Sequence, residues 1–402
     1  MSTAADLLVP RTNPYPLYAE LRNANDGVHY IEPIDTWVML RYADGQRLAR
    51  ERRRWSSDYF GVMLGQHDPE NPVHQRYAQV MSRNLMMNDA PDHSRLRGLL
   101  NHAFVGRAVR AWDPVIQEVL DIVLDSVPVG EEFDAFSMIG EVIPVGVITR
   151  LIGVPFADRE RFRRLSVAFA SSIDPLVVGE ERDQVIRESV ELFDYVRELA
   201  QDRSRESGDD LLSTLIQAEE DGSKLDMDEL VAQVCMLLVA GNETTADLIT
   251  TGLALLLQHP DQLALVRDDP TLIDSAMLEV LRYESPLQFS PRLAAEDIDD
   301  VGDSTIPKGS RVFFGHGSAN HDPRQFERPD EFDIRRGDRS HLAFAAGPHF
   351  CIGNGLALAE GKAFFRDFFA RFDNVTLAGD PELRLDRFIQ RGYKKLPLKV
   401  GS

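Results

Sequence analysis

The stretch FAAGPHFCIG, residues 344–353, decides how this sequence is interpreted. It places Cys351 directly before residues 354–372, whose apolar side chains recur with a helical period. A thiol at the start of a helix faces unpaired backbone N–H groups and the positive end of the helix dipole, which favour the thiolate. Gly347 and Gly353 permit tight turns and the close approach of a flat ligand. The stretch therefore predicts a metal-ligating thiolate.

Other interpretations of Cys351 stay open on these residues alone. For an arbitrary cysteine, the favoured interpretation is a small buried hydrophobic side chain in a glycine-rich loop. A zinc site needs about four ligands, and the neighbouring ligand types are His341 and His349, with Cys235 more than a hundred residues away. A nucleophilic thiol with His349 as its base would make a hydrolase, although two residues in one loop give weak grounds for a hydrogen bond.

A second signal is AGNETT, residues 240–245, in the middle of a helical run over residues 228–258. We expect so long and apolar a helix to be central, and a buried carboxylate or hydroxyl there costs about 1–3 kcal/mol unless it is satisfied or used. The carboxylate and the hydroxyl in question are those of Glu243 and Thr244. Gly241 removes a side chain one turn earlier and opens space beside the helix. The alternative is a kinked core helix whose polar residues are satisfied by water.

Two further pairs of polar residues lie on helices. Glu279 and Arg282 stand three residues apart among apolar neighbours, which predicts a buried, structural pair that needs a third partner. His93 and Arg97 share one face of a helix that begins near Pro91, and two cationic donors on one face can hold a carboxylate. A solvated helix start is the alternative for this second pair.

The composition predicts a soluble globular protein. The chain has 402 residues, 43% of them hydrophobic and 27% charged, and its formal net charge of −21 disfavours binding to nucleic acids and anionic membranes. The most apolar stretch, residues 230–240, is shorter than the ~20 residues that span a bilayer, and residues 1–16 lack the pattern of a secretory signal. Two distant cysteines suit a reducing compartment. We therefore expect a cytoplasmic protein.

The periodicity gives the order of elements. Helical periodicity dominates over residues 43–50, 90–258 and 354–372, and in a helix that ends near Tyr283. Alternating apolar residues and turn residues predict strands over residues 28–40, 293–314 and 383–400. The fold class is therefore mainly α, with a smaller β-rich region built from both chain ends. No Gly/Ser-rich or Pro-rich linker divides the chain, so we expect a single domain over residues 1–402.

The motifs, taken in order, resemble those of the cytochromes P450, the haem-thiolate monooxygenases. The central AGNETT helix, the Glu279-x-x-Arg282 pair and the cysteine loop carry the resemblance. Segments similar to those of soluble bacterial members occur at residues 209–212, 306–309, 319–323, 329–333 and 341–344. The resemblance implies the family's triangular helical body with its smaller β-rich region.

The resemblance also implies the cofactor and the roles of residues. The cofactor would be haem b, iron protoporphyrin IX, with Cys351 as the thiolate ligand to its iron. Thr244 and Glu243 would deliver protons on the opposite side. The other residues implied to bind haem are His93, Arg97, Ala240, Gly241, Arg292, Phe344, His349 and Gly353. Those implied to line the substrate pocket are Leu237, Leu238, Leu287, Gln288, Phe289, Ser290, Phe388 and Ile389.

Two further positions bear on the resemblance, one as an implied ion-pair partner and one as a departure from the family's usual residue. Arg336 is the implied third partner of Glu279 and Arg282, although Arg335 is adjacent. Ala345 stands where the family often has glycine. The additional methyl group is expected to change the packing or backbone freedom of the loop without removing the cysteine ligand.

The implied activity is the insertion of one oxygen atom from O2 into a hydrophobic small organic substrate, by hydroxylation or epoxidation. No Gly-x-Gly-x-x-Gly follows a predicted strand, so we expect the electrons to come from a separate ferredoxin and its NAD(P)H-dependent reductase. We expect a monomer that binds neither nucleic acid nor membrane. The alternatives are a haem-binding sensor or carrier without turnover, which the Glu243–Thr244 pair disfavours, a cysteine hydrolase, and a peroxide-driven oxygenase.

Overall fold

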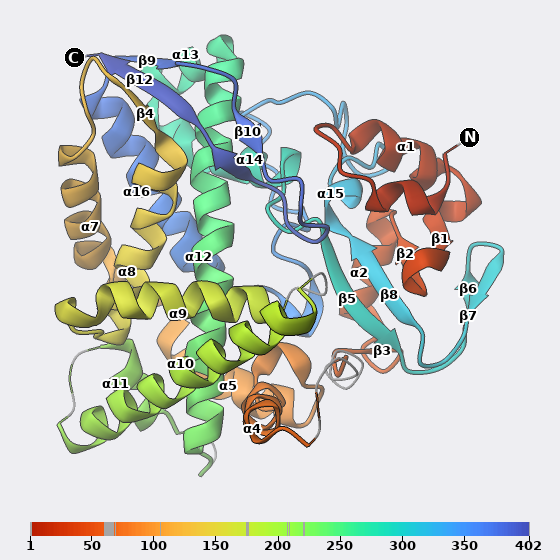
Figure 1. Ribbon diagram of the computed structural model, residues 1–402. Helices are drawn as coiled ribbons and strands as arrows, with labels where there is room; N and C mark the ends of the chain where they lie inside the picture. Colours follow the sequence, from red (N-terminus) through yellow and green to blue (C-terminus); the bar gives the residue numbers. More distant parts are fainter. Residues whose placement is uncertain are drawn as a thin grey trace. The chain divides into compact units, whose positions relative to one another are not determined.

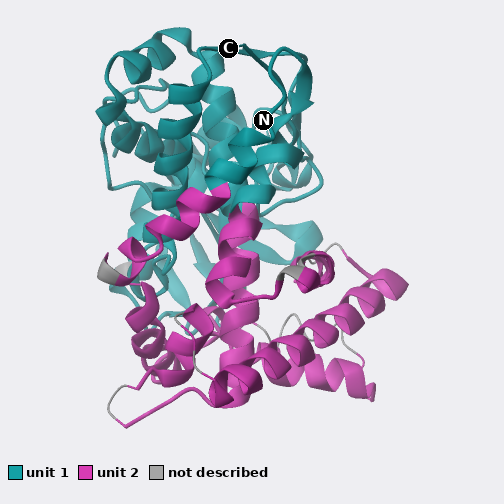
Figure 2. Cartoon of the chain, turned by 90° about the vertical axis from the view of Figure 1, so that its left-hand side faces the viewer, with its two compact units in different colours: residues 1–56, 120–143, 244–402 teal, residues 57–119, 144–243 magenta. Residues whose placement is uncertain are grey.

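A computed structural model describes residues 2–59, 68, 70–104, 106–173, 177–206, 208, 210–219 and 222–401. The chain forms two compact units, shown in Figure 2. Unit 1 comprises Met1–Ser56, Leu120–Ile143 and Thr244–Ser402, and unit 2 comprises Ser57–Val119 and Pro144–Glu243. Helix α12 (Met227–Gln258) is continuous across the boundary between Glu243 and Thr244.

Helices dominate the described part of the chain (Figure 1). Besides α12, the α-helices of the described residues are α1 (Tyr15–Asn23), α2 (Tyr42–Arg50), α4 (Pro72–Met81), α5 (Asp92–Phe104), α6 (Gly106–Arg110), α7 (Asp113–Asp125), α8 (Val142–Ile152), α9 (Arg159–Ser172), α10 (Gly179–Arg205), α11 (Leu211–Gln217), α13 (Pro260–Asp268), α14 (Ile273–Tyr283), α15 (His316–Ala319) and α16 (Asn354–Arg371).

The strands of the described residues belong to unit 1 and form four small sheets. The largest has the order β1-β2-β8-β5-β3, in which only the β2–β8 pair is parallel. A three-stranded sheet has the order β4-β12-β9, and the pairs β6–β7 and β10–β11 stand apart. The bounds are β1 (Val28–Ile31), β2 (Thr36–Met39), β3 (Trp55–Ser56), β4 (Glu132–Asp134), β5 (Phe289–Ala294), β6 (Ile298–Val301), β7 (Ser304–Ile306), β8 (Arg311–Gly315), β9 (Asn374–Leu377), β10 (Glu382–Leu383), β11 (Tyr393–Lys395) and β12 (Pro397–Gly401).

The predicted fold class is confirmed, but the strands β3, β4 and β9 were not predicted. The hairpin over residues 28–40 forms as β1 and β2, and its turn contains Asp35 in the left-handed conformation. The β-rich region draws strands from both chain ends, as predicted. Strand β4, however, lies inside residues 90–258, which were predicted as helical. It has three residues, too few to show a period, and its pairing with β12 supplies the hydrogen bonds that define it.

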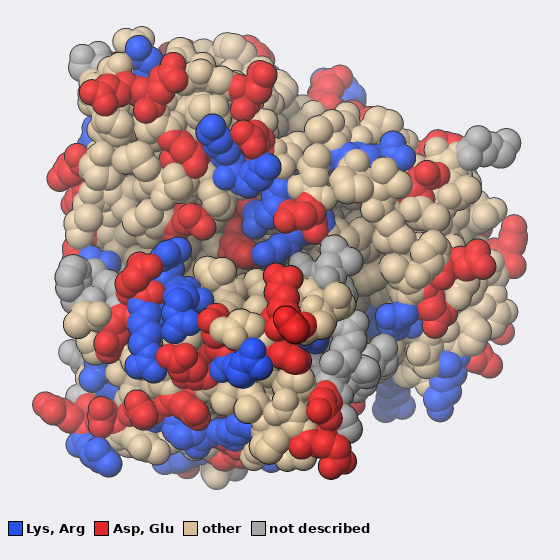
Figure 3. Space-filling view, viewed as in Figure 1, with Lys and Arg blue, Asp and Glu red and all other residues tan. Residues whose placement is uncertain are grey.

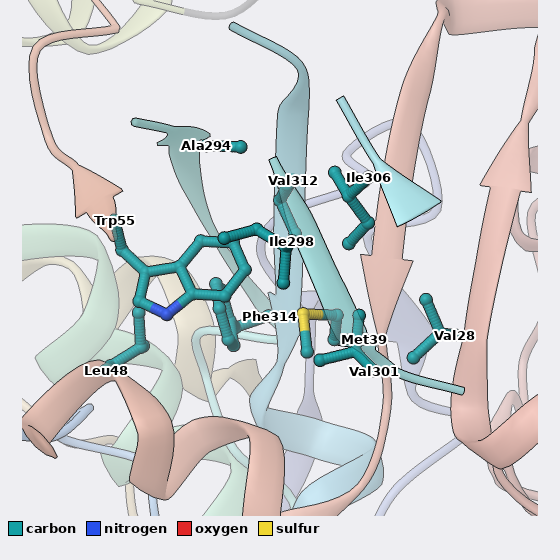
Figure 4. Close-up of a cluster of buried hydrophobic side chains, with 10 residues drawn as sticks. All are labelled: Val28, Met39, Leu48, Trp55, Ala294, Ile298, Val301, Ile306, Val312 and Phe314. Carbon is teal, nitrogen blue, oxygen red and sulfur yellow. The ribbon is translucent and has the colours of Figure 1, made fainter. Parts of the chain in front are cut away.

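The large sheet is buried on both faces, because alternate side chains of β8 point to opposite sides. Val312 and Phe314 enter one cluster, where Phe314 packs edge-on against Trp55 with ring centroids 5.1 Å apart (Figure 4). Phe313 packs against the other cluster, which contains Phe289 and residues of α1. Strand β5 contributes to both clusters, through Ala294 and Phe289, and it carries several residues predicted for the site.

Unit 2 has a separate helical core and a mixed-charge surface. Helices α9 and α10 pack together, with Phe169 and Phe193 in edge-to-face contact at 5.5 Å. Basic and acidic side chains intermingle on the face shown in Figure 3. Arg164 of α9 pairs with Glu188 of α10 at 3.0 Å. Within the described ranges, none of the helices combines the length and the apolar character needed to cross a membrane.

Candidate functional site

The cysteine loop is built by backbone hydrogen bonds around Cys351. The Cys351 N–H donates to the Phe344 carbonyl at 3.0 Å, and its own carbonyl accepts from Asn354 Nδ2 at 2.7 Å. Helix α16 begins at Asn354, so the cysteine precedes the helix as the sequence predicts. The Cys351 side chain is half-buried, and the cysteine forms no disulfide. The loop therefore presents a sulfur donor beside a helix N-terminus.

The backbone of this loop passes twice through the left-handed region. Gly347 has φ +75°, a conformation that glycine adopts without strain. Ala345 has φ +57°, and a side chain in this region costs about 1–2 kcal/mol. Gly353 has an ordinary negative φ, and a Cβ built there would meet no atom within 4 Å. Gly353 therefore leaves space, whereas Gly347 makes the turn.

The middle of α12 differs from the rest of that helix. Residues 230–236 and 245–256 are buried, whereas Ala240 is exposed and residues 241–244 are half-buried. A Cβ added to Gly241 would meet nothing within 4 Å. Glu243 and Thr244 thus lie in an accessible stretch near the middle of an unbroken helix, between the buried residues 230–236 and 245–256.

On α14, Arg282 and Glu279 form a fully buried ion pair. Arg282 Nε and Nη2 each donate to the Glu279 carboxylate at 2.8 Å, and Nη1 donates to the Asn320 carbonyl at 2.9 Å. Arg336 Nε lies 3.2 Å from Glu279 Oε2, and the Asp333 N–H donates to Oε1 at 3.1 Å. The Glu279 carboxylate therefore has two guanidinium partners and one backbone donor.

Strand β5 places Ser290 and Arg292 on the same side, two residues apart. Ser290 Oγ lies 2.8 Å from Nε2 of His316, a buried histidine that the sequence analysis did not single out. Burial, with Arg292 nearby, lowers the pKa of His316 to about 3. The imidazole is therefore neutral at ordinary pH.

The predicted pocket residues of unit 1 come together from two segments. The Gln288 N–H donates to the Ile389 carbonyl at 2.8 Å, and Leu287 pairs with Gln390. The rings of Phe289 and Phe388 stack with centroids 4.5 Å apart and planes within 9°. Phe289 itself is 1% exposed and belongs to the core cluster beside α1.

The predicted residues of unit 2 lie on two helices. His93 is buried on α5, and Arg97 is half-buried one turn later. On α12, Leu238 is buried and Leu237 is half-buried. Arg95 of α5 pairs with Glu229 of α12, which ties these two helices together within the unit.

The described residues contain no group of three or more His, Cys, Asp or Glu side chains that could hold a metal ion. The zinc alternative therefore finds no ligand set among them. The second cysteine, Cys235, is fully buried, and burial raises its pKa. Of the two cysteines, Cys351 is the accessible one.

Sequence reasoning also missed two charged residues that the structure pairs. Asp247, on α12, is fully buried and accepts a hydrogen bond from Arg384 Nη2 at 2.5 Å. The available signal was an isolated carboxylate one turn after Thr244 in an apolar helix. Its partner lies far along the sequence, so no local pattern could identify the pair.

The comparisons with known proteins agree with this arrangement. The family model for cytochrome P450 matches residues 178–270 and 267–400. The 6-deoxyerythronolide B hydroxylase of Saccharopolyspora erythraea is 36% identical, over 96% of this chain and 96% of its own length. The vitamin D(3) 25-hydroxylase of Pseudonocardia autotrophica is 36% identical, over 97% of this chain and 94% of its own.

Solved structures give the same result. The cytochrome P450 PksS of Bacillus subtilis superposes with a TM-score of 0.86 at 31% identity, covering 97% of both chains. P450BioI, solved with an acyl carrier protein that carries hexadec-9Z-enoic acid, has a TM-score of 0.87 at 31% identity, covering 99% of this chain and 100% of its own. The chain therefore belongs to the cytochrome P450 family and is a haem-thiolate monooxygenase, an enzyme that inserts one oxygen atom from O2 into an organic substrate.

Proposed function

We propose that this monooxygenase binds haem b through Cys351 and oxidises a hydrophobic small molecule. The observation that carries the proposal is a half-buried, disulfide-free sulfur donor that directly precedes a long helix. The donor chemistry suits iron, because thiolate ligation is one of the ways in which proteins hold haem. The open space beside Gly353 and Gly241 suits a flat, bulky group. The residues present therefore fit the cofactor.

The proposal gives each remaining haem-site residue a role. Haem, when bound, would supply the iron at which O2 is activated. Its carboxylates would be held by four cationic or hydrogen-bonding side chains, and its ring would be contacted by four smaller or apolar residues. The first group is His93, Arg97, Arg292 and His349, and the second is Ala240, Gly241, Phe344 and Gly353.

In this proposal, two residues of α12 transfer protons. The Glu243 carboxylate would take up a proton and pass it to Thr244 Oγ1, whose hydroxyl would hold it ready for donation. Their half-buried place near the middle of α12, between two buried segments, supports this role. Glu279, Arg282 and Arg336 take no part in proton transfer in this proposal and have a structural role.

The substrate pocket would be lined mainly by apolar residues. They are Leu237, Leu238, Leu287, Gln288, Phe289, Ser290, Phe388 and Ile389. An apolar lining with two hydrogen-bonding side chains fits a hydrophobic molecule that carries a polar group. The relatives named for 6-deoxyerythronolide B and vitamin D(3) hydroxylation support this substrate class.

We further propose that electrons come from a ferredoxin and its NAD(P)H-dependent reductase, and that the protein works in the cytoplasm as a monomer. The sequence has no dinucleotide fingerprint after a predicted strand, and its two cysteines form no disulfide. Residues 1–402 would act as one catalytic domain, since α12 is a single helix that belongs to both units.

The first experiment is the absorption spectrum of the dithionite-reduced protein with carbon monoxide. We expect a strongly red-shifted Soret band in the wild type and in Cys235→Ala, and its loss in Cys351→His. An unshifted band in the wild type would reject Cys351 as the ligand. Absence of any Soret band after reconstitution with haem would reject the cofactor and bring the hydrolase alternative forward.

The second experiment separates an enzyme from a sensor or carrier. Thr244→Ala should retain haem but divert reducing equivalents from product to peroxide and water. Thr250→Ala is the matched control, because the Thr250 hydroxyl donates to the Ala246 carbonyl of the same helix at 2.8 Å. Equal coupling in both variants would remove Thr244 from the proton path.

A further inference from the structure

The loop between β10 and β11, residues 384–392, is attached to α12 by a buried ion pair. Asp247 is 0% exposed, and Arg384 Nη2 donates to its Oδ1 at 2.5 Å. Gly392 is part of the fit, because a Cβ built there would overlap the Asp247 carboxylate. Burying two opposite charges is costly unless their geometry is good, so the pair calls for a role.

Arg384 also organises the loop itself. Its backbone N–H donates to the Gly392 carbonyl at 2.9 Å, which closes the base of the loop. Its guanidinium lies over the Phe136 ring, 5.9 Å from the centroid. The side chain that reaches α12 is therefore fixed by the loop that it holds.

The other end of the loop is attached elsewhere. Arg391 pairs with Glu284, which follows α14, and its Nη2 donates to the Thr12 carbonyl at 2.7 Å. Between the two attachments lie Phe388 and Ile389. Arg391 thus ties the loop to the end of α14, whereas Arg384 ties it to the helix that carries Thr244.

The position of Asp247 on α12 connects the Asp247–Arg384 pair to the segment that carries Glu243 and Thr244. Asp247 comes three residues after Thr244 and four after Glu243, so the three share one side of the helix. A shift of the Arg384 attachment would therefore change the spacing between the loop residues Phe388 and Ile389 and this segment of α12.

We propose that the Asp247–Arg384 pair is a positioning device that holds residues 384–392 against α12 and so determines which bulky molecules fit beside Phe388 and Ile389. This inference rests on the proposed function, which assigns these two residues to the substrate pocket. Neither charged residue contacts the substrate in this inference. They act through the loop.

The test uses the haem-loaded protein with two azoles that bind haem iron, imidazole as the small probe and clotrimazole as the bulky one. In Asp247→Asn we expect faster amide exchange in residues 384–392, an unchanged affinity for imidazole, and an affinity for clotrimazole changed by about tenfold. Gly392→Ala keeps both charges but displaces the Asp247 carboxylate, so it should show the same changes in amide exchange and clotrimazole affinity. It therefore tests the inference even if Asp247→Asn folds poorly. Arg205→Gln, which breaks an exposed pair with Asp202, is the matched control.

The outcomes separate the inference from the proposed function. Unchanged exchange in residues 384–392 of both variants would overturn the positioning role. If Phe388→Ala alters clotrimazole binding but Asp247→Asn and Gly392→Ala do not, the inference fails while the pocket assignment stands. If all three leave clotrimazole binding unchanged, the pocket assignment itself is wrong, and the specificity role is lost with it.

Discussion

Two neighbouring regions of unit 1 differ in whether their buried carboxylates are fully hydrogen-bonded. In the ion-pair cluster of Glu279, Arg282 and Arg336, the buried carboxylate is bonded to two guanidinium groups and a backbone N–H. In the second region, the cysteine loop with α16, Ala345 has a strained backbone. Glu360 there is 3% exposed, and its Oε2 has no hydrogen-bond partner among the described residues.

The two regions pack directly against each other. Lys362 of α16 pairs with Asp274 of α14 at 3.0 Å, and a Cβ added to Gly361 would lie 3.4 Å from Met277 Sδ. The helix that carries Glu279 and Arg282 thus packs against the helix that follows the strained loop. Strain of this kind persists only where the surroundings enforce it, and it is characteristic of functional sites.

The largest effect at neutral pH is expected from breaking the satisfied cluster. Glu279→Gln leaves Arg282 buried with a neutral partner, and loss of one member of a buried pair costs about 3–5 kcal/mol. Urea unfolding of the haem-loaded protein, monitored by the Soret band, measures this change. Asp202→Asn, in an exposed pair, should change stability by less than ~0.5 kcal/mol. A midpoint for Glu279→Gln equal to that control would show that the cluster is dispensable.

A pH-dependent effect, smaller at neutral pH, is expected at Glu360. Burial raises its pKa from 4.5 to about 8, so between these values the folded protein holds a proton that the unfolded chain has released. The free energy of unfolding contributed by this group is therefore full below pH 4.5 and falls as pH rises toward about 8.

Glu360→Gln removes this titration. We expect the variant to gain stability relative to the wild type as pH rises, by on the order of 4–5 kcal/mol near pH 8, and to differ little near pH 5. Urea unfolding at several pH values measures the gap. A gap independent of pH would mean that Glu360 is ionised in the folded protein.

The smallest effect is expected at Ala345. Ala345→Gly relieves the left-handed strain of about 1–2 kcal/mol, offset by about 0.5–1 kcal/mol of additional unfolded-chain entropy. A net gain of roughly 0.5–1 kcal/mol should appear as a higher unfolding temperature of the haem-loaded protein. Ala346→Gly is the matched control, because Ala346 has φ −148° and should only lose stability. A loss in both variants would refute the assignment of strain to Ala345.

The elements that carry these two regions could be predicted from the sequence, but the residues that pair with their buried charged groups could not. The order of helices and strands follows from period and turn chemistry, and α14 ends at Tyr283 as expected. The choice between Arg335 and Arg336 needed the structure. Arg336 reaches Glu279, whereas the side chain of Arg335 is 61% exposed and pairs with Asp333.

Groups whose partners lie far along the chain were missed for the same reason. Asp247 meets Arg384, and His316 meets Ser290, through packing that no local pattern records. Glu360 was missed because its defining properties are its burial and an Oε2 atom that has no hydrogen-bond partner among the described residues, which a sequence motif cannot show. The cysteine loop was found because its residues are contiguous.

The parallel pairing of β2 with β8 also affects how the protein is made. Thr36 lies beside Arg311, so the centre of the large sheet joins two distant parts of the chain. During synthesis, β1 and β2 leave the ribosome long before β8, and the apolar edge of β2 must wait while unit 2 and α12 are translated. Such non-local pairing slows folding and prolongs exposure to aggregation. We therefore expect cellular yield to depend on chaperones and on translation speed more than on the equilibrium stability of the finished enzyme.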